Sequence, residues 1–199
     1  LIDLGGRRLI KKLWDVHVHL QFPEITPPKS LATRTIKYGL NAIQGFHEAG
    51  ITGIRTAGVD NWIDVAWKGA FASGEFVGPR IFAGGNFLTT TAGHGHGQDF
   101  AVESDGPEAF LKAVREQIQN GVDHIKLDLS GGIMGPPWDR HWQNFLLPEE
   151  LEAVFRLCQL RGYKVMSHAT NPVAVKAAIR LGTWTIEHGY MMDDECIRM

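Results

Sequence analysis

The sequence predicts an α/β fold, a (β/α)8 barrel of the TIM type that is incomplete and contains about strands 1–6. Six strand-like segments alternate with helix-like segments along the 199 residues, an order typical of parallel strands joined by crossover helices. The first predicted strand runs into residues 21–24, and these do not form the glycine-rich turn of a nucleotide-binding doubly wound sheet. A complete barrel typically needs about 250 residues, so we expect roughly two strand–helix units to be missing. The open doubly wound sheet remains the alternative.

The predicted strands are short apolar or alternating runs between turn-forming residues. They span residues 13–20, 51–56, 80–83, 124–129, 163–168 and 183–188. Helix signals lie between most of them, because proline favours the first helical position and glycine the position after the end. The predicted helices begin at Pro107, Pro148 and Asn171-Pro172, and they end at Asn120-Gly121, Gly162 and Gly182.

Three segments do not follow the repeating strand–helix pattern. Residues 1–12 resemble a strand, a Gly5-Gly6 turn and a second short strand, and they are too few to form a domain. Residues 22–29 are rich in proline and residues 84–106 are rich in glycine, and both are predicted to be long loops. Because each follows a predicted strand, it would lie on the active-site face of a barrel, where unusual length points to function.

Composition excludes several classes of protein. Lys plus Arg is 20 and Asp plus Glu is 22, and the net charge of −2 argues against a nucleic-acid binder. No apolar run approaches the roughly 18 residues of a membrane span, and two cysteines are too few for a disulfide framework. The expected partner is a small molecule, and a homo-oligomer is compatible with the sequence. The compartment is unknown, with the cytoplasm slightly favoured, because a targeting segment that preceded Leu1 would not be seen.

The clearest local signal is the pair His17 and His19 in the first predicted strand. Side chains alternate along a strand, so both imidazoles point to one face while the apolar residues around them point to the other. Two imidazoles in this arrangement can share a metal ion. A pair of hydrogen-bonded histidines near a strand end explains the same pattern equally well.

The fourth predicted strand places His124, Lys126 and Asp128 opposite an apolar face. Polar groups that point into a barrel need partners, because an unpaired buried charge is costly. The simpler interpretation is an internal ion pair between Lys126 and Asp128, with His124 assisting. The functional alternative is a desolvated Lys126 that is carbamylated by carbon dioxide and bridges two cations. From this segment alone the ion pair is favoured.

Four further histidines lie at the ends of predicted strands or within a predicted loop. His168 and His188 end the fifth and sixth strands, and together with His17, His19 and Lys126 they would converge on one mouth of a closed barrel. That convergence favours a metal centre. His94 and His96 lie among glycines of the loop after the third strand, where they could contact substrate, or titrate on a mobile surface loop without consequence.

This combination of residues resembles the amidohydrolase superfamily, in particular its imidazolonepropionase-related Xaa-Pro dipeptidase (prolidase-like) branch. The resemblance covers nearly the whole chain. The matching motifs are Leu13-Trp14-Asp15-Val16-His17-Val18-His19-Leu20, Gly93-His94-Gly95, Ile125-Lys126, Ser130-Gly131-Gly132, Ser167-His168-Ala169 and Ile186-Glu187-His188-Gly189.

The resemblance implies two zinc ions, or other divalent metals, bridged by a carboxylated Lys126. His17 and His19 would hold the more buried ion, His168 and His188 would hold the other, and a hydroxide shared by the metals would attack the carbonyl carbon of the substrate. His94, His96 and Tyr190 would bind the substrate. The catalytic aspartate of the family lies on strand eight, expected beyond Met199, so no catalytic residue is assigned and the isolated segment is expected to be inactive.

The resemblance also implies the domain organisation and leaves three functions open. Residues 1–12 would be the tail of a small flanking β-domain, and residues 13–199 the partial barrel. The favoured function is a zinc-dependent dipeptidase or carboxypeptidase-like amidohydrolase that acts on Xaa-Pro or Xaa-Arg/Lys substrates. The alternatives are a mononuclear cyclic-amide hydrolase or deaminase of the imidazolonepropionase type, and a non-catalytic barrel scaffold.

The chain departs from the family pattern at two further places. Lys11-Lys12 stands where the family usually has Pro-Gly, and residues 55–58 lack the aspartate that commonly follows Arg55.

Overall fold

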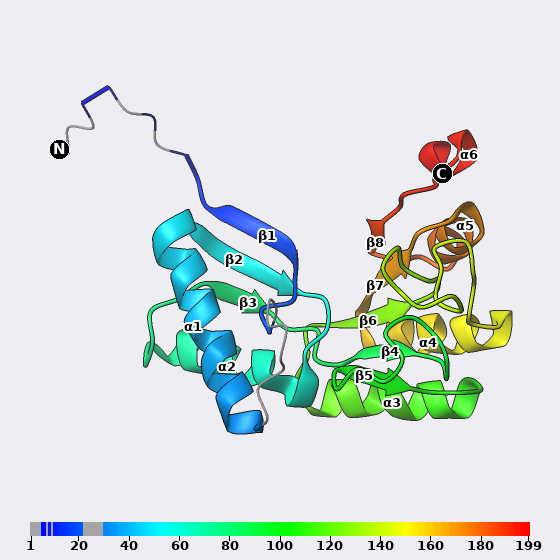
Figure 1. Ribbon diagram of the computed structural model, residues 1–199, viewed down its shortest axis with the longest axis horizontal. Helices are drawn as coiled ribbons and strands as arrows, with labels where there is room; N and C mark the ends of the chain where they lie inside the picture. The colour runs from blue at the N-terminus through cyan, green and yellow to red at the C-terminus, as the bar shows by residue number, and fades with distance from the viewer. Residues whose placement is uncertain (1–4, 7, 9, 22–29) are drawn as a thin grey trace.

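The computed structural model describes residues 5, 6, 8, 10–21 and 30–199, and it shows strands and helices in alternation (Figure 1). The strands are β1 (Leu13–Val18), β2 (Ile51–Thr56), β3 (Arg80–Phe82), β4 (Phe87–Thr89), β5 (Ala101–Glu103), β6 (His124–Asp128), β7 (Lys164–Ala169) and β8 (Thr185–His188). The helices are α1 (Leu31–Ala49), α2 (Ile63–Ser73), α3 (Pro107–Gln119), α4 (Pro148–Arg161), α5 (Pro172–Arg180) and α6 (Asp194–Arg198), and a 3-10 turn precedes α2.

The strands form two sheets in which every registered pair is parallel. One sheet has the order β1-β2-β3 and the other has the order β5-β4-β6-β7-β8. Apart from β5, neighbouring strands follow one another along the chain. A doubly wound sheet reverses its strand order at a switch point, whereas a barrel does not. The predicted TIM-type topology is therefore confirmed, and the open doubly wound sheet is excluded for the part of the chain that the structure describes.

Residues 84–106 are not one irregular loop, because they contain β4 and β5. β4 continues the barrel after β3 and pairs with β6 through Leu88 and Leu127. The break between β3 and β4 includes Gly85, whose φ of +61° suits glycine. β4 and β5 have only three residues each, and this is too few for an alternating pattern to be recognised in the sequence.

The predicted helix boundaries agree with the structure, and local chemistry explains them. Proline occupies the start of α3, α4 and α5, where its missing N–H costs no helical hydrogen bond. The side chain of Asn171 caps α5 by accepting from the N–H groups of Val173 and Ala174. α4 ends at Gly162, which has a left-handed φ of +73°.

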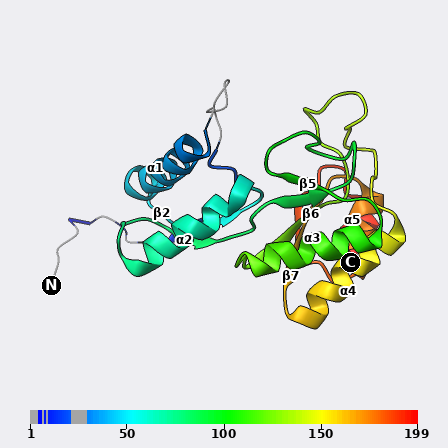
Figure 2. The same cartoon turned by 90° about the horizontal axis from the view of Figure 1, so that it is seen from below.

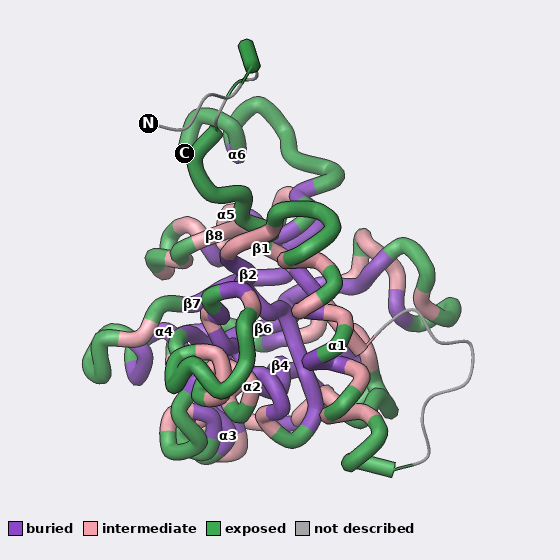
Figure 3. The backbone as a smooth tube through the Cα atoms, turned by 90° about the vertical axis from the view of Figure 1, so that its left-hand side faces the viewer, coloured by how far each residue is buried: buried purple, intermediate pink, exposed green. Residues whose placement is uncertain are grey.

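Two apolar clusters lie between the sheets and their helices. The larger cluster packs the outward side chains of β6, such as Ile125 and Leu127, against Phe110 of α3 and Phe155 of α4. The smaller cluster lies between the β1–β3 sheet and helices α1 and α2. Figures 1 and 2 show α1 and α2 beside the first sheet and α3 and α4 beside the second. Figure 3 shows that the buried backbone runs along β2, β4 and β6, whereas the segment at α6 is mainly exposed.

Some sequence predictions fall on residues outside the described part. Residues 1–4, 7 and 9 belong to the proposed tail of a β-domain, and residues 22–29 are the whole of the proline-rich loop. Gly5 and Gly6 form the predicted turn, and residues 10–12 are not in a strand. The boundary at residue 12 remains a prediction. Among the described residues, no helix is long and apolar enough to cross a membrane.

The packing of α4 gives a matched test of the larger cluster. Leu157 is 9% exposed within it, whereas Leu160, one turn further along the same helix, is 76% exposed. We expect Leu157→Ala to lower the free energy of unfolding by about 2–5 kcal/mol, because a buried cavity is created. Leu160→Ala should change it by less than about 0.5 kcal/mol. Chemical denaturation measures both, and equal effects would contradict this packing.

Candidate metal centre

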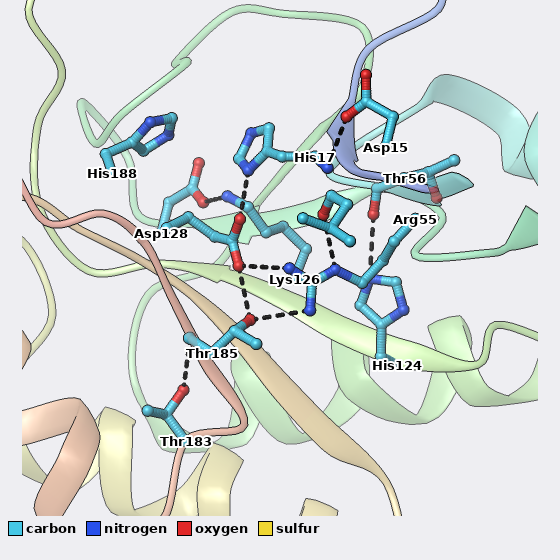
Figure 4. A network of polar contacts seen from close by, with 12 residues as sticks. Asp15, His17, Arg55, Thr56, His124, Lys126, Asp128, Thr183, Thr185 and His188 are labelled. Atoms are coloured by element: carbon cyan, nitrogen blue, oxygen red, sulfur yellow. Dashed lines mark hydrogen bonds and ion pairs between the residues drawn. The ribbon is translucent and has the colours of Figure 1, made fainter. Parts of the chain in front are cut away.

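A pocket of about 580 Å³ opens at the carboxyl ends of the strands and is lined by all five residues predicted to bind metal. His17 comes from β1 and His19 follows it, Lys126 comes from β6, His168 from β7 and His188 from β8. Figure 4 shows the side chains of His17, Lys126 and His188 in one network region, although they come from different strands. Because parallel strands in chain order end on the same side, residues about 170 positions apart meet here.

The imidazole rings form a continuous chain of contacts. Ring centroids are 5.3 Å apart for His17 and His19, 4.8 Å for His17 and His188, and 4.6 Å for His168 and His188. His94 of the loop after β4 stacks on His168 at 4.2 Å. The structure therefore brings four predicted ligands and one predicted substrate-binding residue into one cluster.

One nitrogen of each predicted histidine ligand has a protein partner. His17 Nδ1 donates to Glu187 Oε2 at 2.6 Å, His19 Nδ1 to the Gly58 carbonyl at 3.2 Å, and His168 Nε2 to the Gly131 carbonyl at 3.2 Å. His188 Nδ1 lies 3.1 Å from the Tyr190 hydroxyl. A donor bond from one ring nitrogen of a neutral imidazole leaves the lone pair on the other, and a cation binds that lone pair.

Electrostatics keep these rings in the state that binds cations. Burial lowers the pKa of His19 and of His188 to about 4, and the charge of Lys126 acts in the same direction. Burial also lowers the pKa of His168 well below its ordinary value. At neutral pH these three imidazoles are therefore uncharged, as metal ligands must be.

Lys126 makes the internal ion pair that the sequence allowed. The lysine is 2% exposed, and its amine contacts Asp128 Oδ1. His124 does not assist, because its Nε2 donates to the Thr56 carbonyl at 3.0 Å. The amine also lies 5.6 Å from the centre of the Phe87 ring, so an aromatic side chain lies beside the pair.

Asp128 is also a candidate ligand, a role that the sequence analysis did not assign. The possible ligand atoms of His94, Asp128 and His168 all lie within 4.8 Å of one another. The alternating pattern of β6 places Asp128 on the inward face, and this is the feature of the sequence that could have indicated its role as a ligand.

The three residues predicted to bind substrate line the same pocket. His94 Nδ1 is 3.0 Å from Asp139 Oδ2, which fixes the ring. His96 Nδ1 lies 2.8 Å from Glu103 Oε1, and Tyr190 is 49% exposed.

Glu187 and Arg55 form a buried group that the sequence analysis did not place in the site. Arg55 Nη2 donates to Glu187 Oε1 at 2.9 Å, and the second carboxylate oxygen accepts from His17. Strand alternation predicts that Glu187 and His188 point to opposite faces. His188 has a left-handed φ of +73°, and at this turn of the backbone His188 lines the pocket while Glu187 contacts His17.

The donor set fits a divalent cation. Four imidazoles, three of them with a lowered pKa, line the same pocket as the buried residues Asp128 and Lys126. Nitrogen and oxygen ligands of this kind suit zinc and similar metals. His17, His19, His168 and His188 are the residues that could hold such ions, with Asp128 and Lys126 between them.

Comparison with known proteins gives matches along nearly the whole chain. The model of the amidohydrolase family matches residues 9–197. Ochratoxinase from Aspergillus niger is 28% identical over 220 residues, which cover 94% of this chain and 44% of that protein. The crystal structure of an amidohydrolase superposes with a TM-score of 0.83 at 29% identity and covers 100% of this chain and 54% of its own. A prolidase complexed with N-methylphosphonate-L-proline gives a TM-score of 0.81 at 30% identity. This match covers 93% of the present chain and 49% of the prolidase chain. The chain thus spans about half the length of these relatives.

The lowered pKa values of His19, His168 and His188 predict how stability depends on pH. In the unfolded chain these groups bind protons near their ordinary pKa of 6.5, whereas in the folded protein His19 and His188 do so only near 4. Between these values the unfolded state binds more protons, so the stability of the metal-free protein should fall as the pH decreases from about 6.5 to about 4.

Denaturation of metal-free protein across this pH range measures the slope. His168→Gln should reduce the slope, because one buried group that resists protonation is removed. His47→Gln on α1, outside the cluster, should retain it. A slope of zero in the unmodified protein would contradict the lowered pKa values of these rings.

Proposed function

The chain belongs to the amidohydrolase family, and on that premise we propose that the protein is a metal-dependent hydrolase that cleaves a peptide or amide C–N bond. The observation that carries this proposal is the convergence of His17, His19, Lys126, His168 and His188 on one pocket. A scaffold without catalysis has no need for five such groups at a single barrel mouth, and the scaffold hypothesis is therefore disfavoured.

We propose two zinc ions as the cofactors, held by the pairs His17–His19 and His168–His188, with carboxylated Lys126 between them. When bound, these ions would lower the pKa of water and polarise the substrate carbonyl. Carboxylation by carbon dioxide would convert the amine of Lys126 into an anionic carbamate, a group that could bind the cations.

The residues around this centre would orient the substrate. His94, His96 and Tyr190 lie on the wall of the pocket and present imidazole and hydroxyl groups that can donate hydrogen bonds to a substrate carboxylate. Asp139 holds His94 in place, because it also accepts from the Gly132 N–H at 3.0 Å and is itself only 3% exposed.

The pocket walls favour an apolar substrate over a basic one. The larger apolar side chains are Phe87, Phe100, Ile133, Met134, Pro136 and Trp138. The acidic lining residues that the structure describes, Asp128 and Asp139, are already paired with Lys126 and His94. A buried arginine or lysine of the substrate would therefore lack an anionic partner there, which is costly. Of the substrates left open, Xaa-Pro fits better than Xaa-Arg or Xaa-Lys.

The contact between Lys126 and Asp128 favours one alternative. If the amine stays in that ion pair, it cannot bridge two cations, and the protein would be a mononuclear hydrolase or deaminase of cyclic amides. The binuclear hypothesis requires Lys126 to bridge two metal ions, whereas the mononuclear hypothesis does not.

Lys126→Ala in the full protein distinguishes these hypotheses. We expect loss of about one metal ion per chain after reconstitution with zinc and bicarbonate, and a fall in peptide hydrolysis of at least about 100-fold. Lys112→Ala changes an exposed lysine of α3 and should alter neither property. Metal analysis and hydrolysis of a dipeptide library, with and without chelator, measure both. Unchanged metal content in Lys126→Ala, or chelator-resistant hydrolysis, would overturn the binuclear proposal.

The substrate preference has its own test in two tryptophans. Trp138 lines the pocket, whereas Trp142 is 62% exposed and is not among the lining residues. We expect kcat/KM for Xaa-Pro dipeptides to exceed that for Xaa-Arg by at least about 10-fold. Trp138→Ala should reduce this ratio by raising KM for the apolar substrates, and Trp142→Ala should preserve it. Faster hydrolysis of Xaa-Arg by the unmodified protein would show that the apolar wall does not select the substrate.

A further inference from the structure

We propose that Glu187, anchored by Arg55, is a positioning residue that holds His17 in the tautomer with the proton on Nδ1 and so presents Nε2 to the metal centre. This inference rests on the proposed function, because it assigns how one of the ligands is oriented.

The carboxylate of Glu187 has a different partner on each oxygen. Oε2 accepts from His17 Nδ1 at 2.6 Å, while Oε1 accepts from Arg55 Nη2 at 2.9 Å and from the Thr185 hydroxyl at 2.6 Å. In Figure 4, dashed lines mark the contacts that His17, Arg55 and Thr185 make in this network. With both oxygens engaged, the carboxylate has a fixed orientation, and the acceptor that faces His17 cannot rotate away.

Arg55 is itself held from three sides. Its Nε donates to the Val16 carbonyl at 2.8 Å, its Nη1 donates to the Thr185 hydroxyl at 3.1 Å, and its guanidinium lies 4.9 Å from the centre of the Trp184 ring. Val16 is adjacent to His17 on β1, whereas Glu187 belongs to β8 of the other sheet. Arg55 therefore fixes the distance between the ligand and the carboxylate that orients it.

The group that faces His17 is part of a buried ion pair. Glu187 Oε1 lies 2.9 Å from Arg55 Nη2, and this guanidinium stabilises the carboxylate as an anion. An anion is the strongest acceptor available for an imidazole N–H. Carboxylate–histidine pairs of this kind fix the tautomer of metal-binding histidines in other proteins.

Stability alone does not explain this arrangement. The arginine and the carboxylate are 8% and 7% exposed, and the desolvation cost of such a pair offsets much of its attraction. A simple cross-sheet ion pair would not need to give one carboxylate oxygen to a histidine at the pocket.

Glu187→Gln tests the proposal, because the glutamine side chain has nearly the same shape as the glutamate side chain. A glutamine has one oxygen and one NH2 group, so it cannot accept from both Arg55 and His17. We expect the affinity for zinc to fall by about 10–100-fold, measured by competition with a chromogenic chelator. In metal-free protein labelled with 15N at histidine, we expect the proton of His17 to move from Nδ1 toward Nε2, with the signal assigned by its loss in His17→Gln.

Glu150→Gln is the matched control. Glu150 is 4% exposed and accepts from two backbone N–H groups at 2.7 Å, but it lies on α4, away from the pocket residues. It should lower stability without changing zinc affinity. Equal zinc affinity for Glu187→Gln and the unmodified protein, with an unmoved His17 proton, would overturn this inference alone. An unmodified protein that binds fewer than one zinc ion per chain would instead overturn the proposed function, whatever the variants do.

Discussion

Parallel strands that follow one another in chain order must all end on the same side of their sheet, and every feature of the pocket depends on this constraint. Crossover helices return the chain to the other side after most strands, so the residues at successive strand ends become neighbours although they are distant in sequence. His17 and Glu187 are in direct contact for this reason. The apolar clusters outside the strands hold this arrangement, because each inward polar residue alternates with an outward residue that packs against a helix.

Burial then decides the protonation of the groups that the strands bring together. Histidines lose their positive charge in this environment, since a neutral ring costs less to bury than an ion. The buried charges at the pocket are paired: Lys126 with Asp128, and Arg55 with Glu187. The pocket therefore holds the neutral imidazoles of His19, His168 and His188 together with the Lys126–Asp128 ion pair, and neutral imidazoles can bind cations.

Much of the fold could be predicted from the sequence, because its signals are local. Pro107, Pro148 and Asn171 act on the first turn of their own helices, and alternation in β6 was visible within seven residues. The prediction failed for β4 and β5, whose three residues each carry no periodic signal. These strands exist because neighbouring strands supply their hydrogen bonds, and such pairing is a property of the assembled sheet.

The same distinction applies to the site. Histidine spacing and strand-end positions are written in the chain, and they were sufficient to select the five groups that line the pocket. The chain alone did not reveal that Arg55 reaches from β2 to Glu187 on β8, that Asp139 holds His94, or that a left-handed backbone turns His188 into the cluster. Each of these depends on distances between segments that only folding sets. Local preferences act over a few residues, whereas the orientation of a ligand results from contacts made across the whole barrel.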